Sequence, residues 1–411
     1  MKHSPDLLLK ICIIAGEFPA RSETFIRDHA LGFARRGHEV VVLSSGPGKG
    51  ISPDELADLH SHGIRTPVWS GFSGGIFRKL RRLTGVLLRR PSMVRFLKCR
   101  SPWHDPDAFI GYFLERALAR LNADVVHVHF GTLARQIDMA GYRGNVVVTW
   151  HGYDANTVPR FQGEGMYREL FGGNSWRHTV GSDFMRRRLL ELGAAAGRLF
   201  LVPMGVDLER FSYRERELRE GETLQLLSVG RLDEMKGHRY LVQAVSELLK
   251  EGVDLSLRIV GSGELENELK AQIQLAGDER IRLLGALDSE QVADEMARAH
   301  VFALTGVVAS TGRVETQGVV YAEAQASGLP VIGSRVGGVA GSMLDGETGL
   351  LCPPEDVNAI KDAIRFFITL PNRIGEFGQR GRAMVEKRFT QDAMLDEFGG
   401  LYRSFGDAGS H

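Results

Sequence analysis

Residues 315–332 read ETQGVVYAEAQASGLPVI, and their pattern predicts a helix over 316–327 followed directly by a buried strand. Glu315 and Glu323 stand eight positions apart, which is about 12 Å along a helix at about 1.5 Å per residue. That spacing matches the two sugars of a nucleotide-sugar, with the helix N-terminus facing the diphosphate between them. Two solvated glutamates on a surface helix would give the same pattern.

The same alternation of helices and short apolar runs occurs in both halves of the chain and is typical of parallel α/β units. Strands are expected at 10–15, 39–44, 125–129, 146–149, 180–182 and 201–202, and then at 224–229, 256–260, 281–284, 301–303, 331–332 and 349–351. This order predicts an α/β fold of two Rossmann-like domains with a cleft between their strand ends.

The length of 411 residues agrees with two domains, because a single core of that size is uncommon. We predict an N-terminal domain over 1–205, a second domain over 206–390, and a C-terminal helix in 391–411 that packs back toward the first domain. Residues 1–205 carry 28 Lys and Arg against 18 Asp and Glu, a net charge of +10, and the remainder carries −10. The first half is therefore expected to meet anionic partners.

The cysteines and the apolar segments point to a reducing compartment. Cys12, Cys99 and Cys352 are far apart and match no metal-binding or disulfide spacing. The apolar run 7–15 is too short for a signal peptide, and no window approaches the roughly 18 apolar residues of a membrane span. A cytoplasmic protein, or one bound peripherally to the inner face of a membrane, is expected.

Two loops that follow apolar runs could hold phosphate groups. Arg231 and Lys236 flank a tight loop that opens a helix, and two cations at such a place suit a diphosphate. Gly261 and Gly263 follow the next strand and allow a ligand to approach the backbone. Glu266 stands where a dinucleotide fingerprint has its third glycine, so a nicotinamide cofactor is not favoured and no cofactor is expected.

A group of histidines lies at the ends of two neighbouring strands of the first half. His127 and His129 lie on one face of their strand by alternation, and His151 and Asp154 come just after the next strand. Because the spacing is not typical of zinc sites, a polar wall facing the substrate is favoured over a metal site. Buried histidines with satisfied hydrogen bonds are the structural alternative, for His127 in particular.

The segment Arg78–Arg100 contains nine Lys and Arg and no acidic residue, with leucines between the cations. A basic amphipathic segment is typical of an anionic membrane surface. Nucleic acid is the competing partner, but beyond Phe96 the segment lacks the interleaved aromatic residues of a nucleic-acid-binding surface. A solvated basic face that covers the core would also give this composition.

Several of these motifs together resemble the retaining glycosyltransferases of family four, which have the GT-B fold. The resemblance covers nearly the whole chain and rests, in this order along it, on Pro203-Met-Gly-Val-Asp207, Arg231-x4-Lys236-Gly237, Gly261-Ser-Gly263 and Glu315-x7-Glu323. Three further motifs resemble the branch that builds bacterial exopolysaccharides, such as colanic acid: Phe18-Pro-x-x-Ser-Glu-Thr-Phe25, His127-x-His129-Phe130 and Thr149-x-His151-Gly-x-Asp154. The first loop carries Arg21-Ser22-Glu23 where many members of the family have two glycines.

The resemblance implies roles for individual residues. Arg231 and Lys236 would bind the donor diphosphate, helped by the backbone of Gly318 and Val319. Glu323 would hold the ribose, Glu315 the donor hexose, and His129 would lie beside the anomeric carbon. The first loop, with Gly16, Ser22, Glu23 and Thr24, would lie across the cleft, and His151 and Asp154 would line the acceptor side.

The expected function is transfer of a hexose, with retention and without a metal ion, from a nucleoside diphosphate sugar. UDP-hexose is favoured over GDP-hexose as the donor, and a lipid-linked oligosaccharide at the inner membrane face is the expected acceptor. Nucleic acid is not an expected partner. The alternatives are a nucleotide-sugar epimerase of the same fold, which would act without an acceptor, and a non-enzymatic nucleic-acid-binding protein.

Overall fold

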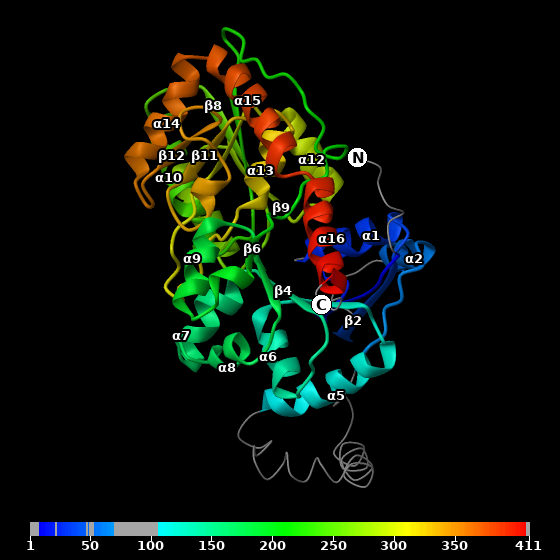
Figure 1. The fold of residues 1–411 in the computed structure, drawn as a ribbon. Coiled ribbons are helices and arrows are strands. Elements are labelled where there is room, and N and C mark those ends of the chain that lie inside the picture. The colour runs from blue at the N-terminus through cyan, green and yellow to red at the C-terminus, as the bar shows by residue number, and fades with distance from the viewer. Residues whose placement is uncertain (1–7, 21–22, 47, 49–52, 70–105, 408–411) are drawn as a thin grey trace.

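The computed structural model describes residues 8–20, 23–46, 48, 53–69 and 106–407. Within them the chain forms two lobes, each built around one parallel β-sheet with helices packed against it (Figure 1). The predicted α/β class with two Rossmann-like sheets is thereby confirmed. Among these residues, no helix is both long enough and apolar enough to cross a bilayer.

The first sheet has six parallel strands in the order β2-β1-β3-β4-β5-β6. The strands are β1 (Lys10–Glu17), β2 (Glu39–Gly46), β3 (Val125–His129), β4 (Val146–Trp150), β5 (Arg177–Val180) and β6 (Leu199–Leu201). The helices of this lobe are α1 (Thr24–Arg35), α2 (Pro53–Ser61), α5 (Pro106–Leu121), α6 (Gly131–Met139), α7 (Val158–Gln162), α8 (Arg168–Gly172) and α9 (Asp183–Glu191). Ile11 pairs with both Val40 and Val125, so β1 lies between β2 and β3.

The second sheet has the order β12-β11-β10-β7-β8-β9 and is also parallel throughout. The strands are β7 (Leu224–Val229), β8 (Leu255–Val260), β9 (Ile281–Gly285), β10 (Val301–Leu304), β11 (Val331–Ser334) and β12 (Gly349–Cys352). The helices are α10 (His238–Lys250), α11 (Glu266–Ala276), α12 (Ser289–Arg298), α13 (Val319–Ala326), α14 (Val357–Thr369) and α15 (Asn372–Arg388). Strands buried on both faces read as continuous apolar runs, which is why the sequence located most of them.

Two of the predicted strands lie earlier in the chain than expected. The strand predicted at 180–182 is β5, which ends at Val180, and the one predicted at 201–202 is β6, which ends at Leu201. Ser182 cannot continue β5, because its hydroxyl accepts a hydrogen bond from the backbone N–H of Met185 and caps helix α9.

The last helix, α16 (Gln391–Asp407), leaves the second lobe and lies beside α1 of the first lobe (Figure 1). Arg36 at the end of α1 binds Asp396 at 2.7 Å, and Phe398 and Tyr402 are buried in the core that also contains β1. The chain therefore crosses between the lobes twice, once after β6 and once before α16. The domain bounds given above, 1–205, 206–390 and 391–411, remain a prediction from the sequence.

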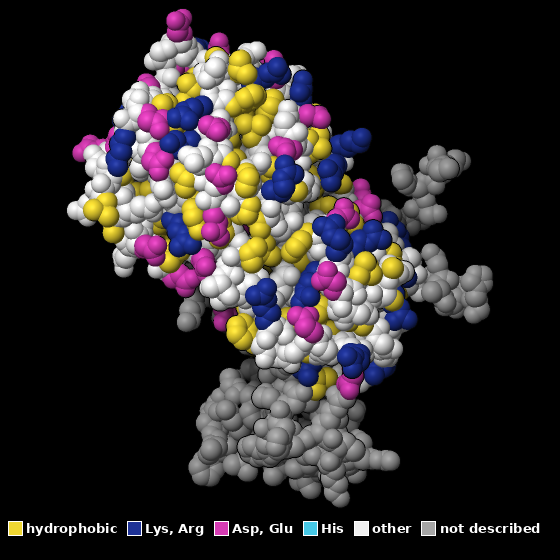
Figure 2. Space-filling view, turned by 90° about the vertical axis from the view of Figure 1, so that its left-hand side faces the viewer, with side chains coloured by type: hydrophobic (Ala, Val, Ile, Leu, Met, Phe, Trp, Pro, Cys, Tyr) yellow, Lys and Arg dark blue, Asp and Glu magenta, His cyan; other side chains and the backbone are white. Residues whose placement is uncertain are grey.

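The surface of the described residues mixes both signs of charge. Figure 2 shows Lys, Arg, Asp and Glu interspersed over both lobes on the face in view. The segment Arg78–Arg100, with nine cations and no acid, lies outside the described residues. Almost the whole excess of +10 in residues 1–205 therefore belongs to that segment.

Candidate active site

A cavity of about 670 Å³ lies between the two lobes, at the carboxyl ends of the central strands. Phe130 follows β3, His151 follows β4, and Gly230 and Arg231 follow β7, and all of them line this cavity. Ligands of parallel α/β sheets bind at this edge, where strand ends and helix starts leave polar groups unpaired. The position of the cavity agrees with the predicted cleft.

The floor of the cavity carries an ion pair from the second lobe. Lys236 Nζ lies 2.5 Å from Glu315 Oε2, and the other oxygen, Oε1, accepts the backbone N–H groups of Thr316 at 3.1 Å and Gly318 at 3.2 Å. Burial raises the pKa of Glu315, but the lysine and the two N–H groups outweigh it, so the pKa is lowered overall. Glu315 is therefore ionised and forms an ion pair with Lys236.

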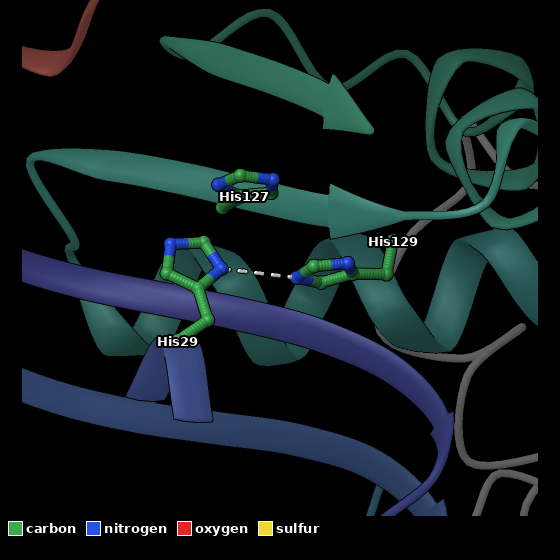
Figure 3. A group of neighbouring side chains, drawn as sticks. All are labelled: His29, His127 and His129. Carbon is green, nitrogen blue, oxygen red and sulfur yellow. Dashed lines mark hydrogen bonds between the residues drawn. The ribbon is translucent and has the colours of Figure 1, made fainter. Parts of the chain in front are cut away.

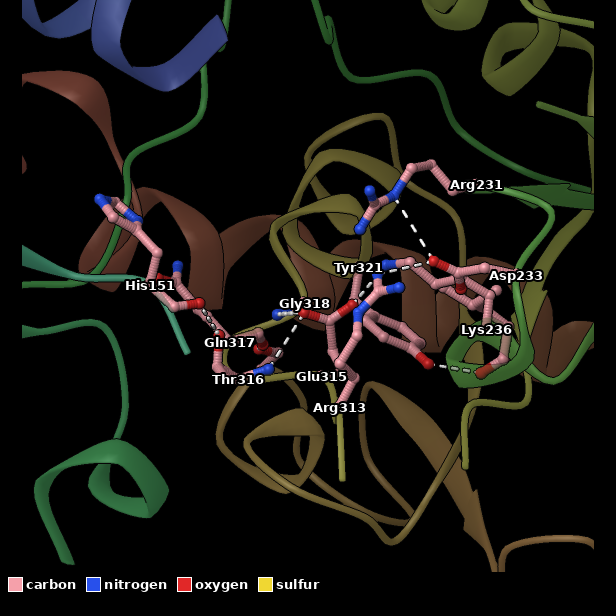
Figure 4. Close-up of polar contacts among 12 residues, drawn as sticks. His151, Arg231, Asp233, Lys236, Arg313, Glu315, Thr316, Gln317, Gly318 and Tyr321 are labelled. Carbon is pink, nitrogen blue, oxygen red and sulfur yellow. Dashed lines mark hydrogen bonds and ion pairs between the residues drawn. The ribbon is translucent and has the colours of Figure 1, made fainter. Parts of the chain in front are cut away.

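Two arginines lie next to this pair and share one carboxylate. Asp233 is 2.8 Å from Arg313 Nη2 and 3.6 Å from Arg231 Nε. Figure 4 shows Arg231, Arg313 and Lys236 around Asp233 and Glu315. Arg313 lines the cavity, although the sequence analysis did not select it. Its position two residues before Glu315, on the same loop, is the signal that could have identified it.

Helix α13 begins later than predicted. It starts at Val319 instead of Thr316, because Gly318 has a φ of +77° and ends the preceding loop. Glu315 therefore lies in that loop and only Glu323 lies on the helix, so the distance of about 12 Å expected for a continuous helix does not apply. Burial and the negative charge of Asp28 raise the pKa of Glu323 to about 7.

The predicted site residues divide into two groups. Those that line the cavity are Glu23, His151, Arg231, Lys236, Glu315 and Glu323. Those that do not line it are Gly16, Thr24, His129, Asp154, Gly261, Gly263, Gly318 and Val319. Ser22 and its neighbour Arg21 lie outside the described residues.

Two of the residues that do not line the cavity have structural roles instead. His129 is completely buried behind His151, with 3.0 Å between its Nδ1 and His151 Nε2, and its predicted place beside the anomeric carbon stays a prediction. Asp154 is also completely buried, and its carboxylate accepts the backbone N–H groups of Gly131, His151 and Gly152 at 2.7–3.2 Å. Asp154 therefore holds the loop that carries His151 and does not itself line the cavity.

The two glycines after β8 are required by loop packing. A Cβ atom on Gly261 would lie 1.9 Å from the carbonyl oxygen of Gly230, and one on Gly263 would lie 2.4 Å from that of Leu232. The predicted close approach of a ligand to these glycines stays a prediction, and the close approach seen in the structure is to the loop bearing Arg231. The glycines thus fix the position of a cavity-lining cation.

Side chains of the first lobe close the cavity opposite the ion pair. Phe25 packs on His151 with ring centroids 4.4 Å apart, and Tyr153 projects into solvent at the rim with 60% of its surface exposed. Thr316 Oγ1 donates to the carbonyl oxygen of His151 at 3.0 Å, so the loop of Glu315 is joined directly to the first lobe (Figure 4). The sequence analysis included Phe25 in a motif but gave neither aromatic residue a role, because only the fold brings both of them to the cavity.

Comparison with known proteins shows that both halves of the chain match family models of glycosyltransferases. Residues 22–210 match the family model described as Glycosyltransferase Family 4, and residues 209–384 match the model described as Glycosyl transferases group 1. A putative colanic acid biosynthesis glycosyltransferase, WcaL of Escherichia coli K12, is 26% identical, over 96% of this chain and 100% of its own length. The amylovoran biosynthesis glycosyltransferase AmsK of Erwinia amylovora is 25% identical, over 93% and 96%.

Solved structures share the architecture. The crystal structure of Anabaena Alr3699/HepE in complex with UDP-glucose superposes with a TM-score of 0.72, covering 97% of this chain and all of that one, at 16% sequence identity. At this identity the likeness extends to the fold alone, and it identifies the two lobes as the two halves of a GT-B architecture.

Proposed function

Because the chain belongs to glycosyltransferase family 4, we propose that its cavity holds a nucleoside diphosphate sugar and that the hexose is transferred from it with retention. The observation that carries this proposal is the pairing of Lys236 with Glu315 beside Arg231 and Arg313, at the strand ends that border the cavity. Since the family consists of glycosyltransferases, the epimerase alternative is set aside.

The three cations have the placement that a diphosphate requires. Lys236 lies in the short 3-10 turn Glu234–Lys236, and the following Gly237 has a φ of +64°, with a hypothetical Cβ only 2.0 Å from the carbonyl oxygen of Thr305. This packing holds the lysine at the end of β7. On donor binding, the ammonium group would turn from Glu315 to the diphosphate, and Glu315 would accept hydroxyl groups of the hexose. Glu323 would hold the ribose.

The leaving diphosphate can accept the proton that the acceptor loses. The bond from the anomeric carbon to the phosphate oxygen breaks, and the acceptor oxygen forms its new bond on the same face of the sugar. The proton of the acceptor hydroxyl passes to the departing phosphate oxygen. Lys236, Arg231 and Arg313 would stabilise the negative charge that develops there, which is electrostatic stabilisation of a leaving group.

Transfer is expected to continue in the presence of a chelator. The three cavity-lining cations can balance the charge of the diphosphate, so a divalent ion is not needed for that role. The measurement is transfer of labelled hexose with and without excess EDTA, after dialysis against EDTA. Complete loss of transfer that Mg²⁺ or Mn²⁺ restores would contradict this account of the leaving group.

The acceptor is proposed to be a lipid-linked oligosaccharide of exopolysaccharide synthesis. What supports this proposal is that the relatives WcaL and AmsK are named as glycosyltransferases of colanic acid and amylovoran biosynthesis. UDP-hexose is favoured as the donor over GDP-hexose. The test is transfer from each labelled donor to a polyprenyl-diphosphate oligosaccharide. Hydrolysis or epimerisation of the donor without transfer to any saccharide acceptor would contradict the proposal.

The segment Arg78–Arg100 is proposed to bring the enzyme to the anionic inner face of the membrane. Each cation near such a surface contributes about 1 kcal/mol, so replacing Arg81, Arg82, Arg89 and Arg90 by Glu is expected to abolish binding to anionic vesicles. The measurement is co-sedimentation with phosphatidylserine vesicles at low salt, with neutral vesicles as the control. Equal sedimentation of wild type and variant would exclude this role.

A further inference from the structure

A continuous chain of hydrogen bonds runs from the cavity into the core of the first lobe. Its members, in order, are His151, His129, His29, Tyr402, His127, Thr149 and Thr179. Neighbouring atoms are 2.5–3.2 Å apart, and Figure 3 shows three of the histidines and the bond between His29 and His129. Only His151 lines the cavity. Tyr402 belongs to α16, which arrives from the second lobe.

The four histidines of this chain are neutral in the resting protein. Burial lowers the pKa of His29 and of His151 to about 3, and it lowers the pKa of His127 and of His129 well below the usual value. A neutral imidazole has one N–H group and one bare nitrogen, so it donates on one side and accepts on the other. All the protons of the chain must therefore point the same way along it.

The inner end of the chain sets this direction. The hydroxyl group of Thr179 lies 3.4 Å from the backbone carbonyl oxygen of Val148, which can only accept, and this single contact gives the direction, because the 2.6 Å contact between Thr179 and Thr149 fits either donor. Thr149 must then donate to Thr179, and His127 must donate to Thr149 through Nε2. The bare Nδ1 of His127 accepts from Tyr402.

The same donor and acceptor assignment can be continued from Tyr402 outward to His151 at the cavity. Since the hydroxyl proton of Tyr402 is used on His127, His29 must donate to Tyr402 through Nε2 and must accept at Nδ1 from His129. His129 Nδ1 is then bare, so His151 must donate to it through Nε2. The Nδ1 atom of His151 remains without a proton, and no described residue forms a hydrogen bond to it.

We propose that this chain fixes the tautomer of His151, with its proton on Nε2 and its bare Nδ1 available to a substrate hydroxyl group in the cavity. Tyr402 acts as a positioning residue, since its hydroxyl group joins the outer histidines to the anchored inner part of the chain. The role of His151 toward a hydroxyl group rests on the proposed function. The tautomer is a property of the protein without substrate.

A metal ion held by the same histidines is the competing arrangement. One nitrogen from each of His29, His127 and His129 lies within 4.8 Å of the others. However, both nitrogens of each ring already have hydrogen-bond partners, and the rings of His127 and His129 are only 10° from parallel. Lone pairs in nearly parallel planes do not converge on one ion, so the hydrogen-bonded chain is favoured.

Two substitutions are expected to reverse the tautomer of His151 from a distance. In Tyr402→Phe, the Nε2–H group of His29 would lose its acceptor, and a buried unpaired N–H group costs more than an unpaired acceptor. His29 should then move its proton to Nδ1, and His129 and His151 should follow. In Thr179→Val, Thr149 would lose its acceptor and should donate to His127 instead, which reverses the whole chain.

The measurement is the ¹⁵N NMR spectrum of histidine-labelled protein at pH 7.5, because protonated and bare ring nitrogens have well-separated chemical shifts. Signals of His151 are assigned with His151→Gln. In wild type, Nδ1 is expected in the range of bare nitrogens and Nε2 in the range of protonated ones. In both variants the two signals are expected to exchange ranges.

Tyr321→Phe is the matched control, because it removes an equally buried hydroxyl group, which donates to Leu304 in the second lobe. It should leave the His151 signals unchanged. A wild-type Nδ1 in the protonated range, or wild-type signals in both variants, would overturn the proposal. A shift of the His29, His127 and His129 signals with one equivalent of Zn²⁺ would show a metal site and overturn it as well.

The use of two variants and of an NMR readout separates a wrong tautomer from a misfolded variant and from a failure of the proposed function. If Tyr402→Phe does not fold, Thr179→Val decides the result alone, since Val has nearly the shape of Thr. No donor, acceptor or turnover enters the measurement. A failed transfer assay would therefore leave this result standing, and an unexpected tautomer would not remove the donor site.

Discussion

Lys236→Ala is expected to lower kcat about 10²–10³-fold while the protein stays folded. The lysine is placed to stabilise the charge on the departing diphosphate, and one such donor is typically worth this factor. Since the stabilisation is largest in the transition state, the loss should appear in kcat more than in the KM for the donor. The measurement is steady-state transfer with varied donor, together with circular dichroism.

The effect must be separated from the loss of an ion pair. Without Lys236, the partly buried carboxylate of Glu315 would keep its backbone N–H partners but lose its cation, which is destabilising in itself. The double variant Lys236→Ala, Glu315→Gln removes this charge and should melt closer to wild type than the single variant. Lys270→Ala, which removes an exposed cation paired with Glu266, should keep normal turnover. Normal kcat in a folded Lys236→Ala protein would contradict the role given to the lysine.

Gly261→Ala is expected to destabilise the second lobe by about 2–6 kcal/mol, since backbone strain and overpacking each cost about 1–3 kcal/mol. The added Cβ would lie 1.9 Å from the backbone oxygen of Gly230, and neither loop can move without displacing the end of a central strand. The φ of Gly261, +149°, adds strain for any side chain.

Gly252→Ala is the matched control, because Gly252 also has a positive φ, +82°, but has no atom within 4 Å of the added Cβ. Its cost should be limited to the backbone conformation, about 1–2 kcal/mol. Urea denaturation of the two variants measures the difference. Equal losses for both would show that the packing of the two loops is not what requires glycine at 261.

The fold was predictable because its strands are buried on both faces. Runs such as those of β3 and β7 are mostly apolar, and both were located to the residue. The ends of β5 and the start of α13 were predicted less well, because local backbone features that the apolar pattern does not show determine them. Ser182 caps α9 instead of extending β5, and Gly318 delays the start of α13.

The part of the candidate site that consists of charged side chains was predictable from the sequence. Among the charged residues selected from the sequence, those that line the cavity include Arg231, Lys236, Glu315 and Glu323. His129 and Asp154 have the same polar character in the sequence, but the fold turns them away from the cavity into hydrogen bonds with His151, His29 and backbone N–H groups. Which of several neighbouring polar side chains faces a cavity depends on packing between distant segments.

The most direct test of the central claim is a thermal-shift titration with UDP-hexose, GDP-hexose and free hexose. A nucleotide-sugar at 100 times its dissociation constant is expected to stabilise the wild type by about 2.7 kcal/mol, and free hexose at the same concentration should not. Glu323→Ala, which removes the proposed ribose contact, should reduce this gain. If neither nucleotide-sugar stabilised the wild type, or if the gain persisted fully in Glu323→Ala, the cavity between the lobes would not be the donor site.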